Sequence, residues 1–168
     1  IWIGTGGGGL NLFNRSTEKF SVYLKTINDN ILDIAEDSNG NLLVATDGSG
    51  IIKLSAGKKH SSIIKDSYPN SINSIWSLAV DNENTIWIGT NGNGLFKYNG
   101  SKLQSIPLNK NDGISQGSAN ITDIQIVNDN IIWVSTEGGL YQLNRDGKVI
   151  KSYFNIPTDQ FSLRTNII

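Results

Sequence analysis

The chain has 168 residues, no cysteine, no methionine and a single histidine, His60. Without cysteine there is no disulfide framework, no thiolate metal site and no thiol nucleophile. No apolar run exceeds four residues, which excludes a membrane-spanning helix and the apolar centre of a signal peptide within this segment. Because no methionine starts the sequence, we expect an excerpt of a longer protein.

The chain also lacks an excess of charge of either sign and lacks helical periodicity. Lysine and arginine number 14 against 15 aspartates and glutamates, so no basic surplus indicates a nucleic-acid partner or an anionic membrane. Almost no segment places apolar residues at i, i+3, i+4 and i+7, so we expect little helix. The sequence is instead rich in turn formers, with 21 asparagines and 18 glycines.

One segment recurs four times, as "IWIGTGGGGLNLFN" from residue 1, "LLVATDGSGIIKLS" from 42, "IWIGTNGNGLFKYN" from 86 and "IWVSTEGGLYQLN" from 132. The threonines of these segments are Thr5, Thr46, Thr90 and Thr136. Their separations of 41, 44 and 46 residues match the length of a four-stranded propeller blade.

The first copy also contains a G-x-G-x-x-G pattern at Gly4, Gly6 and Gly9. In dinucleotide-binding proteins that pattern joins a strand to a helix, whose N-terminus holds the pyrophosphate. Here "LNLFN" follows, which is typical of a second strand. The glycines therefore belong to the repeat, and the nucleotide interpretation is very weak.

Each repeat predicts four strands, named A to D in chain order, and the fold class is an all-β propeller of four-stranded antiparallel blades. Strand A is predicted at 31–36, 75–80 and 121–127, and strand B at 42–46, 86–90 and 132–136. In the A–B turns, Gly40 and Asn84 stand where a left-handed backbone is needed. The threonines share one position, which favours a common hydrogen bond over a set of nucleophiles. Trp2, Trp87 and Trp133 repeat with the period, which favours packing between blades over ligand contact.

The repeats divide the chain into 1–29 (partial), 30–72, 73–119 and 120–164, with the stub of a further strand at 165–168. A propeller must close, because an open blade face would leave apolar area in water. Two arrangements satisfy this requirement: a closed ring of four blades or an arc of a larger propeller. The missing A–B hairpin of the first repeat favours the arc.

The segments "DIAEDSNGNLLVATDGSGI" and "SLAVDNENTIWIGTNGNGLFKY" resemble the two-component regulator propeller repeat, roughly D-x-x-G-N-L-W-I-G-T followed by a glycine-rich turn. The matching residues are Asp37, Gly40, Asn41 and Thr46 in one unit and Asp81, Trp87, Ile88, Gly89 and Thr90 in the next. The departures are Leu43, Ala45, Asn84, Val127 and Ser135, which are conservative in role.

This resemblance implies a periplasmic, ligand-sensing segment of a bacterial two-component sensor histidine kinase, with oligosaccharide as a plausible ligand. We expect no enzyme activity and no cofactor in this segment, although the parent protein would be a histidine kinase. The partners would be a small polar ligand or oligosaccharide, the remaining blades of the propeller and, as a further option, a second copy of the chain, with no nucleic acid and no membrane contact. A scaffold propeller that binds proteins is the alternative, and a propeller lyase acting on cyclic peptide antibiotics is a distant one.

The sequence favours a binding site on the loops that vary between repeats, because the matching positions carry the scaffold. The D–A connectors vary most, and they hold the candidate ligand-binding residues Tyr68, Asn70, Asn73, Trp76, Asp112 and Asn120. A sugar uses such a combination of aromatic ring, amide and carboxylate.

The sequence gives little support to catalysis or metal binding. His60 lies in a polar stretch, "AGKKHSS", where a solvated residue is the simpler interpretation. The stretches "DSNGN" and "NRDGK" have too few oxygen ligands for a calcium loop and are better explained as hairpin turns. No catalytic residue and no metal ligand is predicted.

Overall fold

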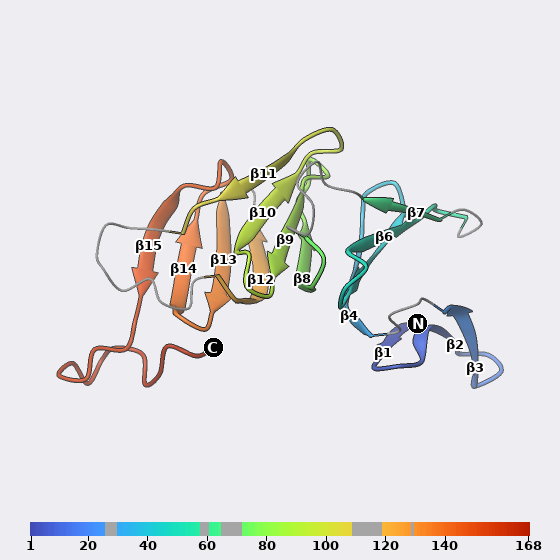
Figure 1. Cartoon of the computed structure of the whole chain (residues 1–168), viewed down its shortest axis with the longest axis horizontal. Helices are drawn as coiled ribbons and strands as arrows, with labels where there is room; N and C mark the ends of the chain where they lie inside the picture. Colours follow the sequence, from blue (N-terminus) through green and yellow to red (C-terminus); the bar gives the residue numbers. More distant parts are fainter. Residues whose placement is uncertain (26–29, 58–60, 65–71, 109–118, 129) are drawn as a thin grey trace. The chain divides into compact units, whose positions relative to one another are not determined.

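The computed structural model describes residues 1–168 except 26–29, 58–60, 65–71, 109–118 and 129. The described residues form fifteen strands and no helix, in four antiparallel sheets that we number blades 1 to 4 in chain order (Figure 1). Two compact units divide the chain, Ile1–Leu78 and Ala79–Ile168, and each is described by itself.

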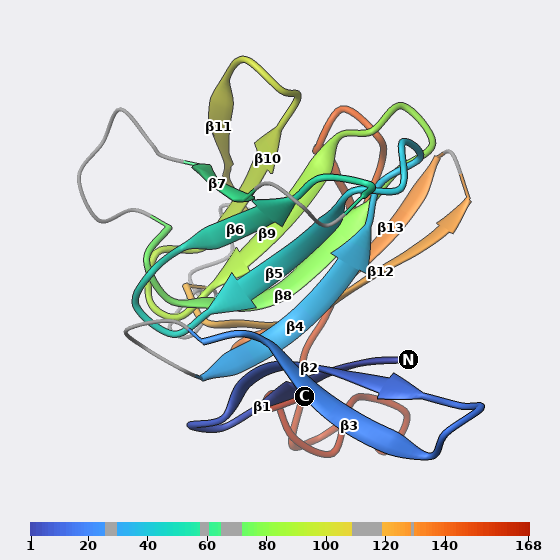
Figure 2. The same ribbon diagram turned by 90° about the vertical axis from the view of Figure 1, so that its right-hand side faces the viewer.

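Blade 1 is three-stranded, and blades 2 to 4 have four strands each in consecutive order. Blade 1 contains β1 (Trp2–Thr5), β2 (Gly9–Asn14) and β3 (Lys19–Leu24). Blade 2 contains β4 (Ile31–Glu36), β5 (Leu42–Thr46), β6 (Ile51–Leu54) and β7 (Ser61–Ile64), which can be followed as one twisted sheet in Figure 2. Blade 3 contains β8 (Ile75–Val80), β9 (Ile86–Thr90), β10 (Leu95–Tyr98) and β11 (Leu103–Ile106). Blade 4 contains β12 (Ile121–Asn128), β13 (Ile131–Thr136), β14 (Gly139–Leu143) and β15 (Val149–Tyr153).

The predicted A and B strands are confirmed, with β12 ending one residue later and β13 beginning one residue earlier than expected. The predicted left-handed turn positions are also confirmed, since φ is 73° at Gly40 and 62° at Asn84. Segment 165–168, expected to begin a further strand, is not a strand in the structure. Its last carbonyl, of Ile168, accepts a hydrogen bond of 2.5 Å from Thr122 Oγ1.

The second strand of each complete blade is the most buried because it packs on both faces. All five residues of β5 and of β9 are buried. In the first unit, the core combines side chains of blades 1 and 2: Leu10, Ile31, Leu42, Val44, Ile52 and Leu54. In the second unit, Trp87 of blade 3 belongs to one cluster with Ile121, Ile132 and Tyr141 of blade 4. Apolar burial between adjacent blades therefore stabilises each unit.

A glycine at the fourth position of strand B lets the next blade approach closely. A Cβ built on Gly4 would lie 2.6 Å from Ile31 Cγ2, and one built on Gly89 would lie 2.6 Å from Ile121 Cγ2. Real Cβ atoms do not come this close to other carbons, so the isoleucine that begins the next strand A fills the space of a missing side chain. This explains the glycine in "IWIGT" as a packing requirement.

Candidate functional site

Each blade has two ends with different connections. The B–C turns and D–A connectors lie at one end, which we call the connector face, and the A–B and C–D hairpins lie at the other, the hairpin face. The candidate residues predicted from sequence belong to the connector face.

The B–C turns are fixed to the strand that begins the next blade. In the first unit, the carbonyl of Asn73 accepts hydrogen bonds from the amides of Gly48 (2.8 Å) and Gly50 (3.0 Å). In the second unit, the carbonyl of Ala119 accepts them from Gly92 (3.2 Å) and Gly94 (2.8 Å). The connector backbone is thus held in place just before strand A, where a ligand-binding side chain would need a rigid base.

Asn73 and Trp76 stand at the entry to blade 3, in the first unit. The backbone of Asn73 is fixed by the bonds to the glycine turn, while its side chain is exposed. Next to it, Ser74 Oγ donates a hydrogen bond of 2.8 Å to Asp47 Oδ1 of the preceding B–C turn. Trp76 is the second residue of β8 and is half-buried.

The position equivalent to Trp76 lies at a β-bulge in blades 2 and 4, where the pairing of strand A is described. The pairing of β4 with β5 skips Leu32, and the pairing of β12 with β13 skips Thr122. Such bulges redirect a side chain and occur often beside functional sites. Leu32 is 43% exposed, so this position presents its side chain at the surface in blade 2. The repeat places Trp76 at the same point of strand A.

Asn120 lies in the second unit and is half-buried. Its Nδ2 donates a hydrogen bond of 2.5 Å to Glu137 Oε2, and its carbonyl accepts one of 3.2 Å from the Glu137 amide. The residue before strand A and the B–C turn of blade 4 therefore form a polar pair. Glu137 is not among the residues predicted from the sequence. Its place directly after Thr136 in the repeat would have been the available signal.

A cavity of about 350 Å³ opens on the connector face of the second unit. It is lined by the B–C turn of blade 3 and the first residue of β10 (Gly92 to Leu95), by residues 105–108 and by Ala119. Tyr68, Asn70 and Asp112 lie outside the described residues, as does His60. The connector site as a whole therefore stays a prediction.

The repeated threonines have the predicted structural role. Each donates a hydrogen bond from Oγ1 to the carbonyl of the glycine at or directly before the start of strand C, at 2.8 Å for Thr5 and Thr46, 2.6 Å for Thr90 and 2.9 Å for Thr136. In blades 2 to 4 the same oxygen also accepts an amide proton from the turn. Both hydrogen-bonding functions of the hydroxyl are used to hold the turn.

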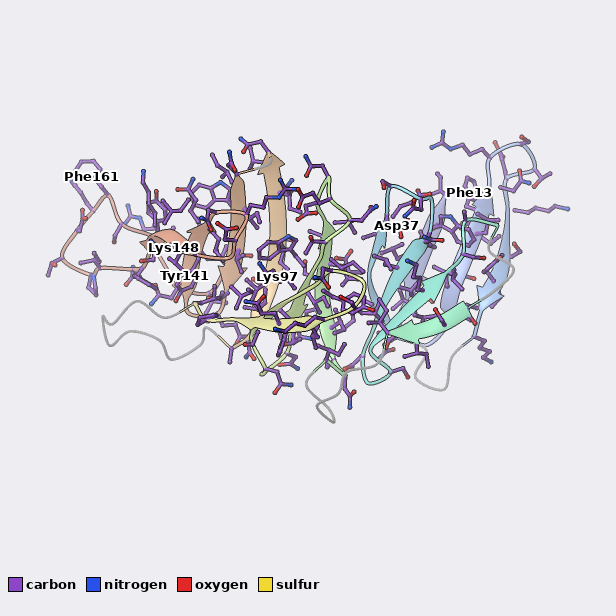
Figure 3. The ribbon with its side chains drawn as sticks, turned by 90° about the horizontal axis from the view of Figure 1, so that it is seen from above. Phe13, Asp37, Lys97, Tyr141, Lys148 and Phe161 are labelled. Carbon is purple, nitrogen blue, oxygen red and sulfur yellow. The ribbon has the colours of Figure 1, made fainter. Side chains whose placement is uncertain are left out.

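Asp37 and Asp81 shape the A–B hairpins. Asp37, labelled in Figure 3, accepts hydrogen bonds at Oδ1 from the Asn39 and Asn41 amides. Its Oδ2 accepts one of 3.1 Å from Lys53 Nζ. Burial tends to raise the pKa of the Asp37 carboxyl. The hydrogen bonds from the Asn41 side chain and amide, and the charge and hydrogen bond of Lys53, outweigh that effect and lower the pKa. The carboxylate therefore serves the turn, in agreement with the hairpin interpretation of "DSNGN".

Within the described ranges, no group of three or more histidine, aspartate or glutamate side chains could hold a metal ion. Across the same residues, no helix is long and apolar enough to cross a bilayer.

Two segments of the chain, residues 26–48 and 71–92, match the two component regulator propeller model. No curated protein matches the chain in sequence. The chain therefore carries two component regulator propeller repeats, as the resemblance predicted.

Solved structures similar to the chain are β-propellers. One is the extracellular domain of a protein described as a hybrid two component system from B. thetaiotaomicron, with 21% identity, a TM-score of 0.78 and coverage of 99% of this chain. A second such domain from the same organism has 20% identity, a TM-score of 0.58 and the same coverage of this chain. Virginiamycin B lyase from Staphylococcus aureus has 18% identity and a TM-score of 0.69, with 96% of this chain covered.

The chain spans only part of these proteins: 22% and 28% of the two extracellular domains and 53% of the lyase. At these identities the matches show the fold alone, and they confirm the predicted all-β propeller of antiparallel blades.

Proposed function

Because the chain carries two component regulator propeller repeats, we propose that it is an extracytoplasmic, ligand-sensing propeller segment of a bacterial two-component sensor histidine kinase. The repeat matches carry this proposal, and the likeness of 99% of the chain to extracellular domains of two-component systems supports it. The segment would be periplasmic and would require the other blades of a larger propeller, since it spans 22% of the more similar extracellular domain.

The proposed ligand is an oligosaccharide bound on the connector face, with Tyr68, Asn73 and Trp76 contributing most. Asn73 offers an exposed amide on a backbone held by two hydrogen bonds. Trp76 offers a half-buried indole at the position that bulges in blades 2 and 4. An indole face packs on the apolar face of a sugar ring, and amides bind its hydroxyls. Asn70 belongs to the same connector, and Asp112 and Asn120 are the predicted ligand-binding residues of the equivalent connector in the second unit.

Calorimetric titration of the intact sensor region with a panel of oligosaccharides tests this proposal. Trp76→Ala and Asn73→Ala should each weaken binding by about 1–3 kcal/mol, the range for a lost ring contact or hydrogen bond. Asn130→Ala is the matched control, because Asn130 is an exposed asparagine in an A–B turn on the hairpin face. If both connector variants keep the affinity of the wild-type protein and their fold is intact by circular dichroism, the ligand does not bind at this connector.

The lyase likeness supports a second candidate, since virginiamycin B lyase shares the fold. We propose that this segment is not catalytic, because it contains one histidine and that histidine stands in a polar stretch outside the connectors. Incubation of the protein with quinupristin, the compound bound in one of the lyase structures, gives the test. Opening of the antibiotic ring at a rate abolished by His60→Ala would overturn the sensor assignment.

A further inference from the structure

A second cavity, of about 290 Å³, lies on the hairpin face of the second unit. The A–B hairpin of blade 3, strands β10 and β11 with the C–D hairpin between them, and the C–D hairpin of blade 4 contribute its walls. It is lined by three acidic, three basic and three neutral polar side chains, and by no apolar residue. The connector site proposed above is at the other end of the blades, so this cavity requires a separate explanation.

Two of the three acidic side chains are occupied by contacts within the protein. Asp81 Oδ1 accepts hydrogen bonds from the amides of Glu83 (3.0 Å) and Thr85 (2.8 Å). Asp81 Oδ2 accepts one of 3.2 Å from Trp87 Nε1. Glu83 Oε1 forms an ion pair with Arg145 Nη2 at 2.7 Å. Their negative charges are therefore directed at the fold rather than at the cavity.

The lysine and glutamine hydrogen-bond donors that line the cavity make fewer contacts within the protein than these acidic groups. Among the described residues, neither the Lys102 ammonium nor the Gln104 amide has a hydrogen-bond partner, and both side chains are exposed. Lys97 Nζ, labelled in Figure 3, donates one hydrogen bond of 3.0 Å to the Asp146 carbonyl and lies 5.8 Å from the centre of the Trp87 ring. An ammonium can donate three hydrogen bonds, so Lys97 keeps capacity for a ligand.

The third carboxylate of the cavity, that of Asp146, makes weaker contacts within the protein than the other two. The Asp146 carboxylate makes a single long contact, 3.5 Å from Asn144 Nδ2 to Asp146 Oδ2. The cavity therefore offers two ammonium groups and an amide as hydrogen-bond donors for an anion. The Asp146 carboxylate can accept hydrogen bonds from hydroxyl groups. Its volume of about 290 Å³ lies just below the range for pockets of drug-sized ligands, about 300–1,000 Å³, so the ligand must be small.

We propose that this cavity binds a small organic acid that carries one carboxylate and several hydroxyl groups, of the size of a single sugar acid. Lys97 and Lys102 hold the carboxylate, because charge-assisted hydrogen bonds are the strongest contacts the cavity can make. Asp146 and Gln104 bind the hydroxyl groups. A neutral sugar would leave both ammonium groups without an anionic partner, and an inorganic anion would leave the hydroxyl-binding groups unused.

Calorimetric titration of the intact protein with D-glucuronate, D-glucose and inorganic sulfate tests the proposal. Glucuronate should bind at least tenfold more tightly than either of the other two, and added salt should weaken it. Lys102→Gln, which keeps a polar side chain of similar length, should weaken glucuronate binding about tenfold, the effect of one charge-assisted hydrogen bond. Lys148→Gln is the matched control, because Lys148, labelled in Figure 3, is exposed in the C–D hairpin of blade 4 and does not line the cavity.

The outcomes separate the possibilities. Equal affinity for glucuronate and glucose, or no loss in Lys102→Gln, would overturn the carboxylate contact. Equal affinity for sulfate and glucuronate would overturn recognition of the hydroxyl groups. Both lysines are on the hairpin face, so a negative result for glucuronate does not bear on the connector site. Likewise, unchanged oligosaccharide binding in Trp76→Ala does not bear on this cavity.

Discussion

Replacing Trp87 by alanine should be among the most destabilising single changes in the second unit. The Trp87 side chain is fully buried, and it belongs to the cluster that joins blade 3 to Ile121 and Ile124 of blade 4. Removing a large aromatic side chain from a core costs about 3–5 kcal/mol through lost burial and the cavity left behind. The Asp81 carboxylate would also lose its hydrogen bond to Nε1, but it would keep its two bonds to backbone amides.

Urea unfolding followed by circular dichroism measures this loss, and two further variants divide it into its parts. Trp87→Phe keeps a ring and removes the indole N–H, so it should lose less stability than Trp87→Ala. Phe161→Ala removes an aromatic side chain that is 89% exposed and projects from the C-terminal segment, so it should change stability by less than about 0.5 kcal/mol (Figure 3). A loss below about 1 kcal/mol in Trp87→Ala would refute the packing between blades.

Three further predictions concern stability and use the same unfolding measurement. Gly89→Ala should cost about 1–3 kcal/mol, because its Cβ would meet Ile121, whereas Gly6→Ala should cost much less, because its nearest neighbour is 3.8 Å away. Thr90→Val keeps the shape but removes both turn hydrogen bonds, so a loss of about 1–3 kcal/mol is expected, and an unchanged midpoint would contradict the turn role. Asp37 has a lowered pKa in the folded state, so its stabilisation is present above its usual value of 3.8 and is lost as the pH falls through the folded pKa. Asp37→Asn should therefore destabilise the protein at pH 7, and the difference should shrink as the pH falls below 3.8 towards the lowered pKa of the folded state. A pH-independent difference would contradict this.

The sequence predicted the strands well because the repeat provides internal evidence. Four copies of one segment align the A and B strands with one another, and a turn position such as Asn84 is identified by the glycine at the same place in another copy. The threonine role followed for the same reason, since a residue type that recurs at one position has one structural cause.

Features that depend on three-dimensional neighbours could not be predicted in this way. Asp33 Oδ2 accepts a hydrogen bond of 2.7 Å from the Leu78 amide and so joins β4 to the part of β8 that belongs to the first unit. Nothing in the local pattern distinguishes Asp33 from a solvated strand residue. The bulges at Leu32 and Thr122 arise from pairing register, which period alone does not determine. The hairpin-face cavity combines residues from two blades, so it requires their packing to be known.

The candidate ligand-binding residues were predicted from loop variation, and the structure describes half of them. Asn73 and Trp76 lie in the first unit and Asn120 in the second, each at the start of its blade. The role of the Asn73 backbone in holding a glycine turn was not foreseen, because a main-chain contact leaves no trace in residue type.

Ligand-dependent autophosphorylation of the full-length protein, reconstituted in vesicles, tests the sensor assignment most directly. The account predicts that the oligosaccharide that binds most tightly to the isolated sensor region changes the initial rate of phosphate incorporation in the wild-type protein. The same oligosaccharide at the same concentration should leave the rate of a folded Trp76→Ala variant unchanged. An equal response in the wild type and the variant, or a full-length protein that incorporates no phosphate at all, would contradict it.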